Sequence, residues 1–144
     1  MYIKTKSEFN IEASEQLIVK GLFAPSVHCS YYGCFQFMKY KLKDCCGMTY
    51  DSIDNHVISS KKTNSPISEH MHVRRCIINQ LQAQKRIKQA HLIKDNREFE
   101  NMIKDIYKFR LESDYKDSEI DMSTADTALK YSKDVIRYIN NNIK

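Results

Sequence analysis

The segment DNREFENMIKDIYKFRLESDYK, residues 95–116, predicts a helix whose apolar face is interrupted by a charge. Three apolar residues recur at spacings of four and three, as on one face of a 3.6-residue helix: Phe99, Ile103 and Ile106. Arg110 follows on that face, and Asp114 comes one turn later. A buried guanidinium is costly unless it is paired. Asp114 can reach it from four residues away.

This charged pair has two interpretations. In the first, Arg110 and Asp114 form a buried ion pair that only fixes how helices pack. In the second, Arg110 is held at a groove or at a dimer interface, where its planar guanidinium can meet a phosphate.

The rest of the chain also predicts helices. Only 3 Gly and 2 Pro among 144 residues leave little turn chemistry for a β-sandwich or barrel. Besides the segment above, five helical segments are expected: Ser7–Gly21, Ala24–Cys46, Asp51–Ser60, Ser68–Ala90 and Ser123–Asn141. We therefore predict one all-α domain over residues 1–144, an antiparallel up-and-down bundle of four or five helices plus the short segment 51–60.

Apolar spacing and capping residues give details of these helices. Ser7 is the expected N-cap of the first helix, and Ser123 with Asp126 resembles a capping box for the last. Gly33 and Ser30 lie beside the apolar stripe of the second helix, where they would let a neighbouring backbone come close. The inward faces of the first three long helices are expected to carry Phe9, Ala13 and Leu17; Ala24, Val27, Tyr31, Phe35, Met38, Leu42 and Cys45; and Val73, Ile77 and Leu81, with Gln84 as a further candidate.

The net charge of +5 is concentrated in one span. Between His70 and Lys94 there are six basic residues and no acidic one. Such a span can form a positive face that attracts phosphate backbones, although a solvated helix face would look the same. No apolar run approaches the ~18 residues of a membrane span, and the N-terminus MYIKTKSEFN lacks an apolar signal core. We expect a cytoplasmic protein that does not interact with membranes.

Five cysteines, an odd number without an export signal, are expected to be free thiols. No pair of them has the Cys-x2-Cys spacing that structural zinc sites often use. We expect neither a metal ion nor a cofactor.

Three pieces of the chain resemble HEPN domains (higher eukaryotes and prokaryotes nucleotide-binding), in particular the small stand-alone bacterial and archaeal members. APSVHCSYYGCFQFM, residues 24–38, resembles the aromatic-rich helix of the family, with Tyr31 and Tyr32 at its centre. FRLESDY, residues 109–115, is similar to the Arg-x3-Asp-Tyr signature of that subgroup. The third piece is the final helix, which is rich in small residues.

The resemblance implies a helical bundle, usually a homodimer, with the signature arginine near the subunit interface. Many HEPN proteins are metal-independent ribonucleases, often toxins paired with a minimal nucleotidyltransferase or parts of phage-defence systems. Those enzymes use Arg-x4–6-His, whereas the positions after Arg110 hold Tyr115, Lys116 and Asp117. An ionised aspartate cannot donate a proton, so we expect little or no RNA cleavage by this route.

Other histidines are weaker candidates. Arg86 and His91 match Arg-x4-His, but at a different place in the chain, so a chance match is the simpler interpretation. His28 is expected to be a satisfied core residue, and His56 carries no spacing signal.

Three hypotheses remain open. The leading one is a dimeric HEPN-like module that binds a nucleotide or RNA through Arg110, with Asp114 orienting the guanidinium and Tyr115 stacking or hydrogen-bonding; a nucleotidyltransferase is the expected partner protein. The second is a metal-independent endoribonuclease centred on Arg110 or on Arg86 and His91. The third is a structural dimer.

Overall fold

The computed structural model describes residues 2–85 and 91–144, and this part of the chain forms six helices and no strand. The predicted all-α class is therefore confirmed. The helices are α1 (Tyr2–Val19), α2 (Phe23–Cys46), α3 (Tyr50–Ser60), α4 (Glu69–Lys85), α5 (His91–Tyr115) and α6 (Met122–Asn142). None of these helices combines the length and the apolar character that crossing a membrane requires.

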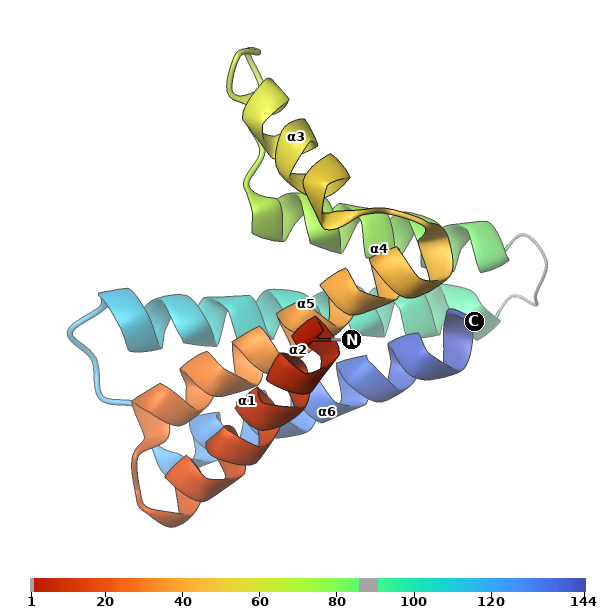
Figure 1. The fold of residues 1–144 in the computed structure, drawn as a ribbon. Helices are drawn as coiled ribbons and strands as arrows, with labels where there is room; N and C mark the ends of the chain where they lie inside the picture. Colours follow the sequence, from red (N-terminus) through yellow and green to blue (C-terminus); the bar gives the residue numbers. More distant parts are fainter. Residues whose placement is uncertain (1, 86–90) are drawn as a thin grey trace.

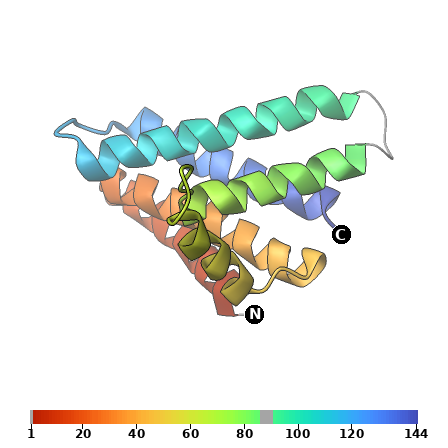
Figure 2. The same cartoon turned by 90° about the horizontal axis from the view of Figure 1, so that it is seen from above.

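Helix α2 is the centre of the fold. It contacts α1, α4, α5 and α6, which surround it on successive sides (Figure 1). Helices α4 and α5 run alongside each other above it when the molecule is seen from the direction of Figure 2. Side chains on several faces of α2 can therefore meet residues that are distant in the sequence.

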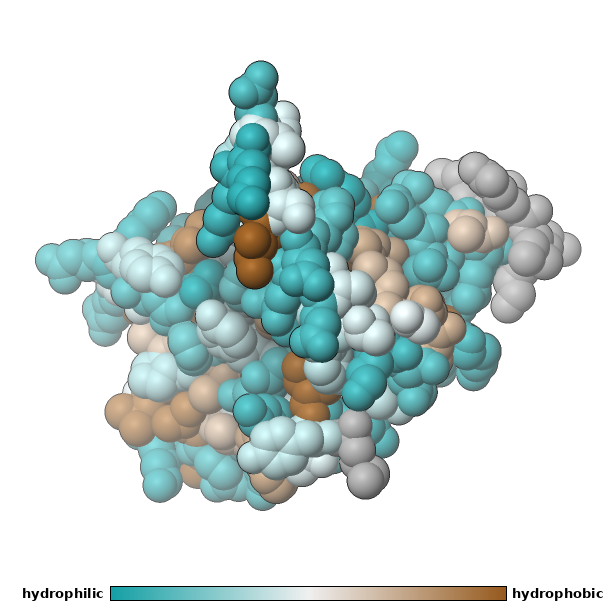
Figure 3. All heavy atoms as spheres, turned by 45° about the horizontal axis from the view of Figure 1, so that its top comes forward, coloured by the Kyte–Doolittle hydropathy of each residue, from teal (hydrophilic) through white to brown (hydrophobic). Residues whose placement is uncertain are grey.

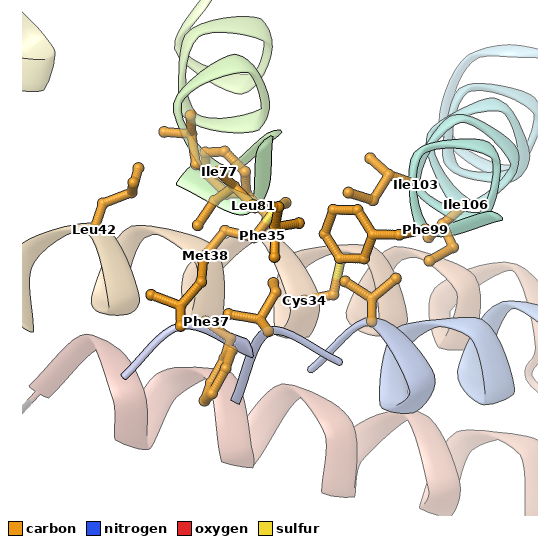
Figure 4. Packing of buried hydrophobic residues seen from close by; sticks show 14 of the residues in the cluster. Cys34, Phe35, Phe37, Met38, Leu42, Ile77, Leu81, Phe99, Ile103 and Ile106 are labelled. Carbon is orange, nitrogen blue, oxygen red and sulfur yellow. The ribbon is translucent and has the colours of Figure 1, made fainter. Parts of the chain in front are cut away.

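The main core lies where α2, α4 and α5 meet, and α6 closes it. In Figure 4, side chains from α2, α4 and α5 point toward one another, and those of Phe99, Ile103 and Ile106 come from α5. The stripes expected for the second, third and fourth long helices are buried except at their outer members Ala24, Cys45 and Gln84, which are half-buried. The buried members are Val27, Tyr31, Phe35, Met38, Leu42, Val73, Ile77, Leu81, Phe99, Ile103 and Ile106.

The face of α1 that packs on α2 is not the one that apolar spacing predicted. Phe9 is 64% exposed, and α1 packs instead through the buried Ser7 and Ser14. The Ser14 hydroxyl lies 2.8 Å from the Ser26 hydroxyl and 2.7 Å from the Ser30 hydroxyl, so these polar groups satisfy one another. Small, mutually hydrogen-bonded side chains let two backbones approach closely, which a Phe9–Ala13–Leu17 interface would prevent.

Gly33 and Ser30 lie at this close approach, as expected for small residues beside the stripe of α2. A Cβ on Gly33 would come within 2.6 Å of Ile11 Cδ1 and 3.4 Å of the Ser7 carbonyl oxygen. The Ser7 hydroxyl donates a hydrogen bond to the Gly33 carbonyl oxygen at 2.6 Å. Ser7 is therefore a packing residue in the middle of α1 and not the predicted N-cap, because the helix begins at Tyr2.

Helix α6 packs along α2 through a regular buried face that includes Ala125, Ala128, Ser132, Val135 and Ile139. The Ser132 hydroxyl donates to the Ser30 carbonyl oxygen at 2.6 Å. At the end of α6, the buried Lys41 ammonium donates to the Ile143 carbonyl oxygen at 3.2 Å. A cation there also opposes the negative end of the α6 dipole.

The N-terminus of α6 differs from the prediction. Asp121 is the N-cap, and its carboxylate accepts a hydrogen bond from the Thr124 backbone N–H at 2.8 Å. The predicted capping box of Ser123 with Asp126 lies two residues too late, because an aspartate fills the N-cap role as well as a serine does.

Helix α3 projects away from the other helices (Figures 1 and 2). Ile53 anchors it in the core, and the His56 ring stacks on the His72 ring of α4 with centroids 4.1 Å apart. The projecting part of the molecule carries mainly hydrophilic residues on the face shown in Figure 3. Only the base of α3 is therefore involved in the core.

Candidate functional site around Arg110

Helix α5 buries Arg110 where the apolar stripe predicted it. The residue follows the buried Ile103 and Ile106 on the same face and is itself only 8% exposed. Because a buried guanidinium keeps its charge at every physiological pH, each of its N–H groups needs a partner or access to water.

Three hydrogen bonds hold the guanidinium. Its Nε donates to Asp114 Oδ2 at 3.1 Å, which is the predicted ion pair. Its Nη2 donates to the hydroxyl oxygens of Tyr32 at 3.1 Å and Tyr115 at 3.4 Å. The structure gives Nη1 no hydrogen-bond partner among the described residues. The Nη1 edge of the guanidinium therefore has no partner among the described residues, although the rest of the group is held in place.

Three tyrosine rings surround the same charge. The guanidinium carbon lies 5.3 Å from the ring centroid of Tyr31, 5.4 Å from that of Tyr32 and 5.5 Å from that of Tyr115. At these distances each ring face attracts a cation. Tyr31 and Tyr32 come from the centre of α2, whereas Tyr115 ends α5 and is 71% exposed. The cage is thus closed toward the core and open at Tyr115.

His28 completes the site, contrary to the expectation that it is a core residue. Its side chain is 46% exposed, and its Nδ1 lies 2.9 Å from Asp114 Oδ2 and 3.1 Å from Oδ1. It faces α5 and not the core because it lies four residues before Tyr32, on the edge of α2 that meets the end of α5. The ring centroids of His28 and Tyr32 are 4.7 Å apart.

A second histidine approaches from α4. His70 Nδ1 and the Tyr31 hydroxyl are hydrogen-bonded at 2.5 Å. Burial, together with the nearby Arg110 charge, lowers the pKa of His70, and burial raises the pKa of Tyr31. Both groups are therefore neutral at pH 7. A small pocket of about 60 Å³ adjoins them, lined among others by Arg74 and Tyr107.

The remaining candidates lie apart from this cluster or outside the described residues. His56 contacts His72 at the base of α3. The Arg86–His91 pair and four of the six basic residues of the span His70–Lys94 fall where side chains are not described. The five cysteines are free thiols, as predicted. In residues 2–84 and 96–144, whose side chains the structure describes, no three histidines, cysteines or carboxylates are arranged to hold a metal ion.

The burial of Arg110 does not require a second subunit. The sequence led us to expect that a dimer interface would cover the charged pair, but Tyr31 and Tyr32 of the same chain already cover it. The homodimer stays a prediction that rests on the family resemblance alone.

Sequence reasoning found Arg110, Asp114 and Tyr115 but missed the residues from other helices. His28 lies 86 positions before Asp114, and Tyr32 lies 78 before Arg110, so no local spacing links them. A usable signal was present in residues 28–32: a histidine precedes two tyrosines by one helical turn, on a helix expected to pack against α5.

Comparisons with known proteins assign no family to this chain, because no family model, no curated protein and no solved structure matches it significantly. Its chemistry therefore has to be inferred from the arrangement itself. A fixed guanidinium with one free edge, an exposed tyrosine ring and a half-exposed imidazole can bind an oxyanion attached to an aromatic group.

Proposed function

We propose that this chain is a HEPN-like module that binds the phosphate of a nucleotide or of RNA through Arg110. The observation that carries the proposal is the unpartnered Nη1 edge of a guanidinium whose other groups are held by Asp114, Tyr32 and Tyr115. A rigid, weakly hydrated guanidinium binds phosphate oxygens without first losing side-chain entropy.

The surroundings favour a nucleotide over a simple anion. Tyr115 is 71% exposed beside the guanidinium, so a base could stack on its free ring face. The first half of α4 adds Arg74 and the exposed Arg75 to the positive charge of the protein. If Arg110 and Asp114 only held helices together, two apolar side chains of similar size would stabilise the fold equally well or better. The presence of the ion pair therefore argues against the structural-dimer hypothesis.

The finer features of the module belong to the same proposal. The helices would form the antiparallel HEPN-like bundle, two copies would associate, and a minimal nucleotidyltransferase would be the partner protein, as in a toxin–antitoxin or phage-defence system. The resemblance of residues 24–38 and 109–115 to the family supports these features.

A direct binding experiment tests the role of Arg110. We expect Arg110→Met to weaken binding of a dye-labelled single-stranded RNA about tenfold or more in fluorescence anisotropy at fixed salt, since a charge-assisted contact is lost. Arg97→Met is the matched control, because Arg97 is an exposed arginine of the same helix. It removes the same charge from α5 but should change affinity only slightly.

A double variant separates binding from folding. Arg110→Met combined with Asp114→Leu replaces the ion pair with apolar side chains, so it should recover stability without recovering binding. Wild-type affinity in this variant, or an equal loss in Arg97→Met, would contradict the proposal.

His28 favours a second candidate function, a metal-independent endoribonuclease. The expectation of little or no cleavage rested on the lack of a histidine after Arg110. His28 supplies an imidazole that is hydrogen-bonded to Asp114, and histidine is the side chain that most often serves as a general acid or base. The test is cleavage of defined oligonucleotides in EDTA. Robust wild-type cleavage that disappears in both Arg110→Met and His28→Asn would favour the enzyme over the binding module.

A further inference from the structure

We propose that His28 sets the charge of the Arg110 site, so that the site binds a phosphate strongly only when the His28 imidazole is protonated. The inference rests on the proposed function and adds to it a ligand-contacting residue and a pH dependence. It begins from the hydrogen bonds of Asp114, which joins α2 to α5.

The charges of the site nearly cancel without His28. The Arg110 guanidinium contributes one positive charge, and the Asp114 carboxylate, bound to its Nε, contributes one negative charge. An approaching phosphate then meets a pair without net charge, and the Asp114 carboxylate weakens the attraction of the guanidinium. Protonation of His28 gives the side chains of Arg110, Asp114 and His28 a net charge of about +1, which strengthens the attraction for a phosphate.

The hydrogen bond also determines which ring nitrogen faces the ligand. Because Nδ1 lies 2.9 Å from Asp114 Oδ2, a neutral His28 keeps its proton on Nδ1 and leaves Nε2 as an acceptor. Two acceptors do not bind each other, so the neutral ring offers a phosphate nothing. The protonated ring has an N–H at Nε2 as well, and a side chain that is 46% exposed can present it to a ligand.

The other ionisable groups that face His28 are Arg110 and Tyr115 of α5 and Tyr32 of α2. The Arg110 guanidinium keeps its charge at every physiological pH. His70 of α4 lies on the other side of Tyr32, with ring centroids 5.9 Å apart. Burial and the Arg110 charge lower the pKa of His70, so it stays neutral through most of this range.

The test is the pH dependence of RNA binding. A single-stranded oligouridylate with a pH-insensitive dye is titrated by anisotropy at constant salt at pH 6, 7 and 8. We expect the wild-type affinity to rise about tenfold from pH 8 to pH 6, the effect of one added charge-assisted hydrogen bond. His28→Asn keeps an amide that can donate to Asp114, and it should bind weakly with no pH dependence.

A control histidine and the Arg110 variant make the outcomes distinct. His56→Gln alters an exposed histidine of α3 and should keep the wild-type pH profile. If His28→Asn keeps that profile, or if wild-type affinity is the same at pH 6 and pH 8, the role of His28 is refuted. If Arg110→Met binds like the wild type at pH 6, the proposed function fails instead.

Discussion

A methyl group added at Gly33 should separate α1 from α2. The Cβ of Gly33→Ala would lie 2.6 Å from Ile11 Cδ1 and 2.9 Å from Ile11 Cγ1, distances at which side chain or helix must move. Overpacking of this kind costs about 1–3 kcal/mol. Alanine in a helix interior returns about 1 kcal/mol relative to glycine. The net expectation is a free energy of unfolding lowered by up to about 2 kcal/mol.

Urea denaturation of the wild type, Gly33→Ala, Ile11→Ala and the double variant measures this effect and identifies its cause. Ile11→Ala removes the two Ile11 atoms that come closest to the new Cβ, so Gly33→Ala should cost less in the Ile11→Ala background, with a coupling of about 1 kcal/mol. The buried hydrogen bond from Ser7 to the Gly33 carbonyl oxygen makes a shift of α1 more costly. If Gly33→Ala raises stability by the helix-propensity gain alone, α1 does not pack on Gly33 and the reasoning is wrong.

Three further predictions concern buried charges and titrating groups. Arg110→Met should lower the free energy of unfolding by about 1–3 kcal/mol in urea denaturation, less than for a fully buried pair because Asp114 remains partly exposed; a loss above 5 kcal/mol would contradict this. Lys41→Met leaves the Ile143 carbonyl without its donor and should cost about 1–2 kcal/mol, with faster amide exchange confined to the last turn of α6; unchanged exchange there would refute it. Burial and the neighbouring histidine lower the pKa of His72 below its ordinary 6.5, so the folded chain favours the neutral ring and the unfolded chain binds more protons. The free energy of unfolding should therefore have its full value above pH 6.5 and should fall as the pH drops below that value. In urea denaturation at several pH values between 5 and 8, His72→Phe should show a smaller fall than the wild type.

The elements that sequence reasoning predicted well share one property: their buried faces are apolar. Ile77 of α4 and Ile103 of α5 belong to periodic stripes, and burial of such stripes is the strongest local signal of a helix face. The interface of α1 was missed because Ser7 and Ser14 carry it. Hydrogen bonds across the interface make those hydroxyls compatible with burial, and hydropathy cannot detect them.

The residues of the candidate site also fall into those that local spacing predicts and those that it does not. Arg110 and Asp114 are four residues apart on one helix, so the geometry of α5 alone predicts their contact. His28 and Tyr32 reach them only because α2 packs against α5, and this depends on the whole bundle. A motif search that requires the histidine to follow the arginine within a few residues cannot find one that comes from another helix.

The packing interface between α2 and α6 has a consequence for folding during translation. Its contacts join residues far apart in sequence, such as Ser132 with Ser30 and Lys41 with Ile143, each 102 positions apart. During synthesis α2 leaves the ribosome long before α6, and the side of α2 that α6 will cover meets water or chaperones in the meantime. Local pairing of α1 with α2 can come early, but this side of the core closes only after most of the chain has been translated. A nascent chain that stalls before Met122 would therefore expose the apolar side of α2 to chaperones and proteases.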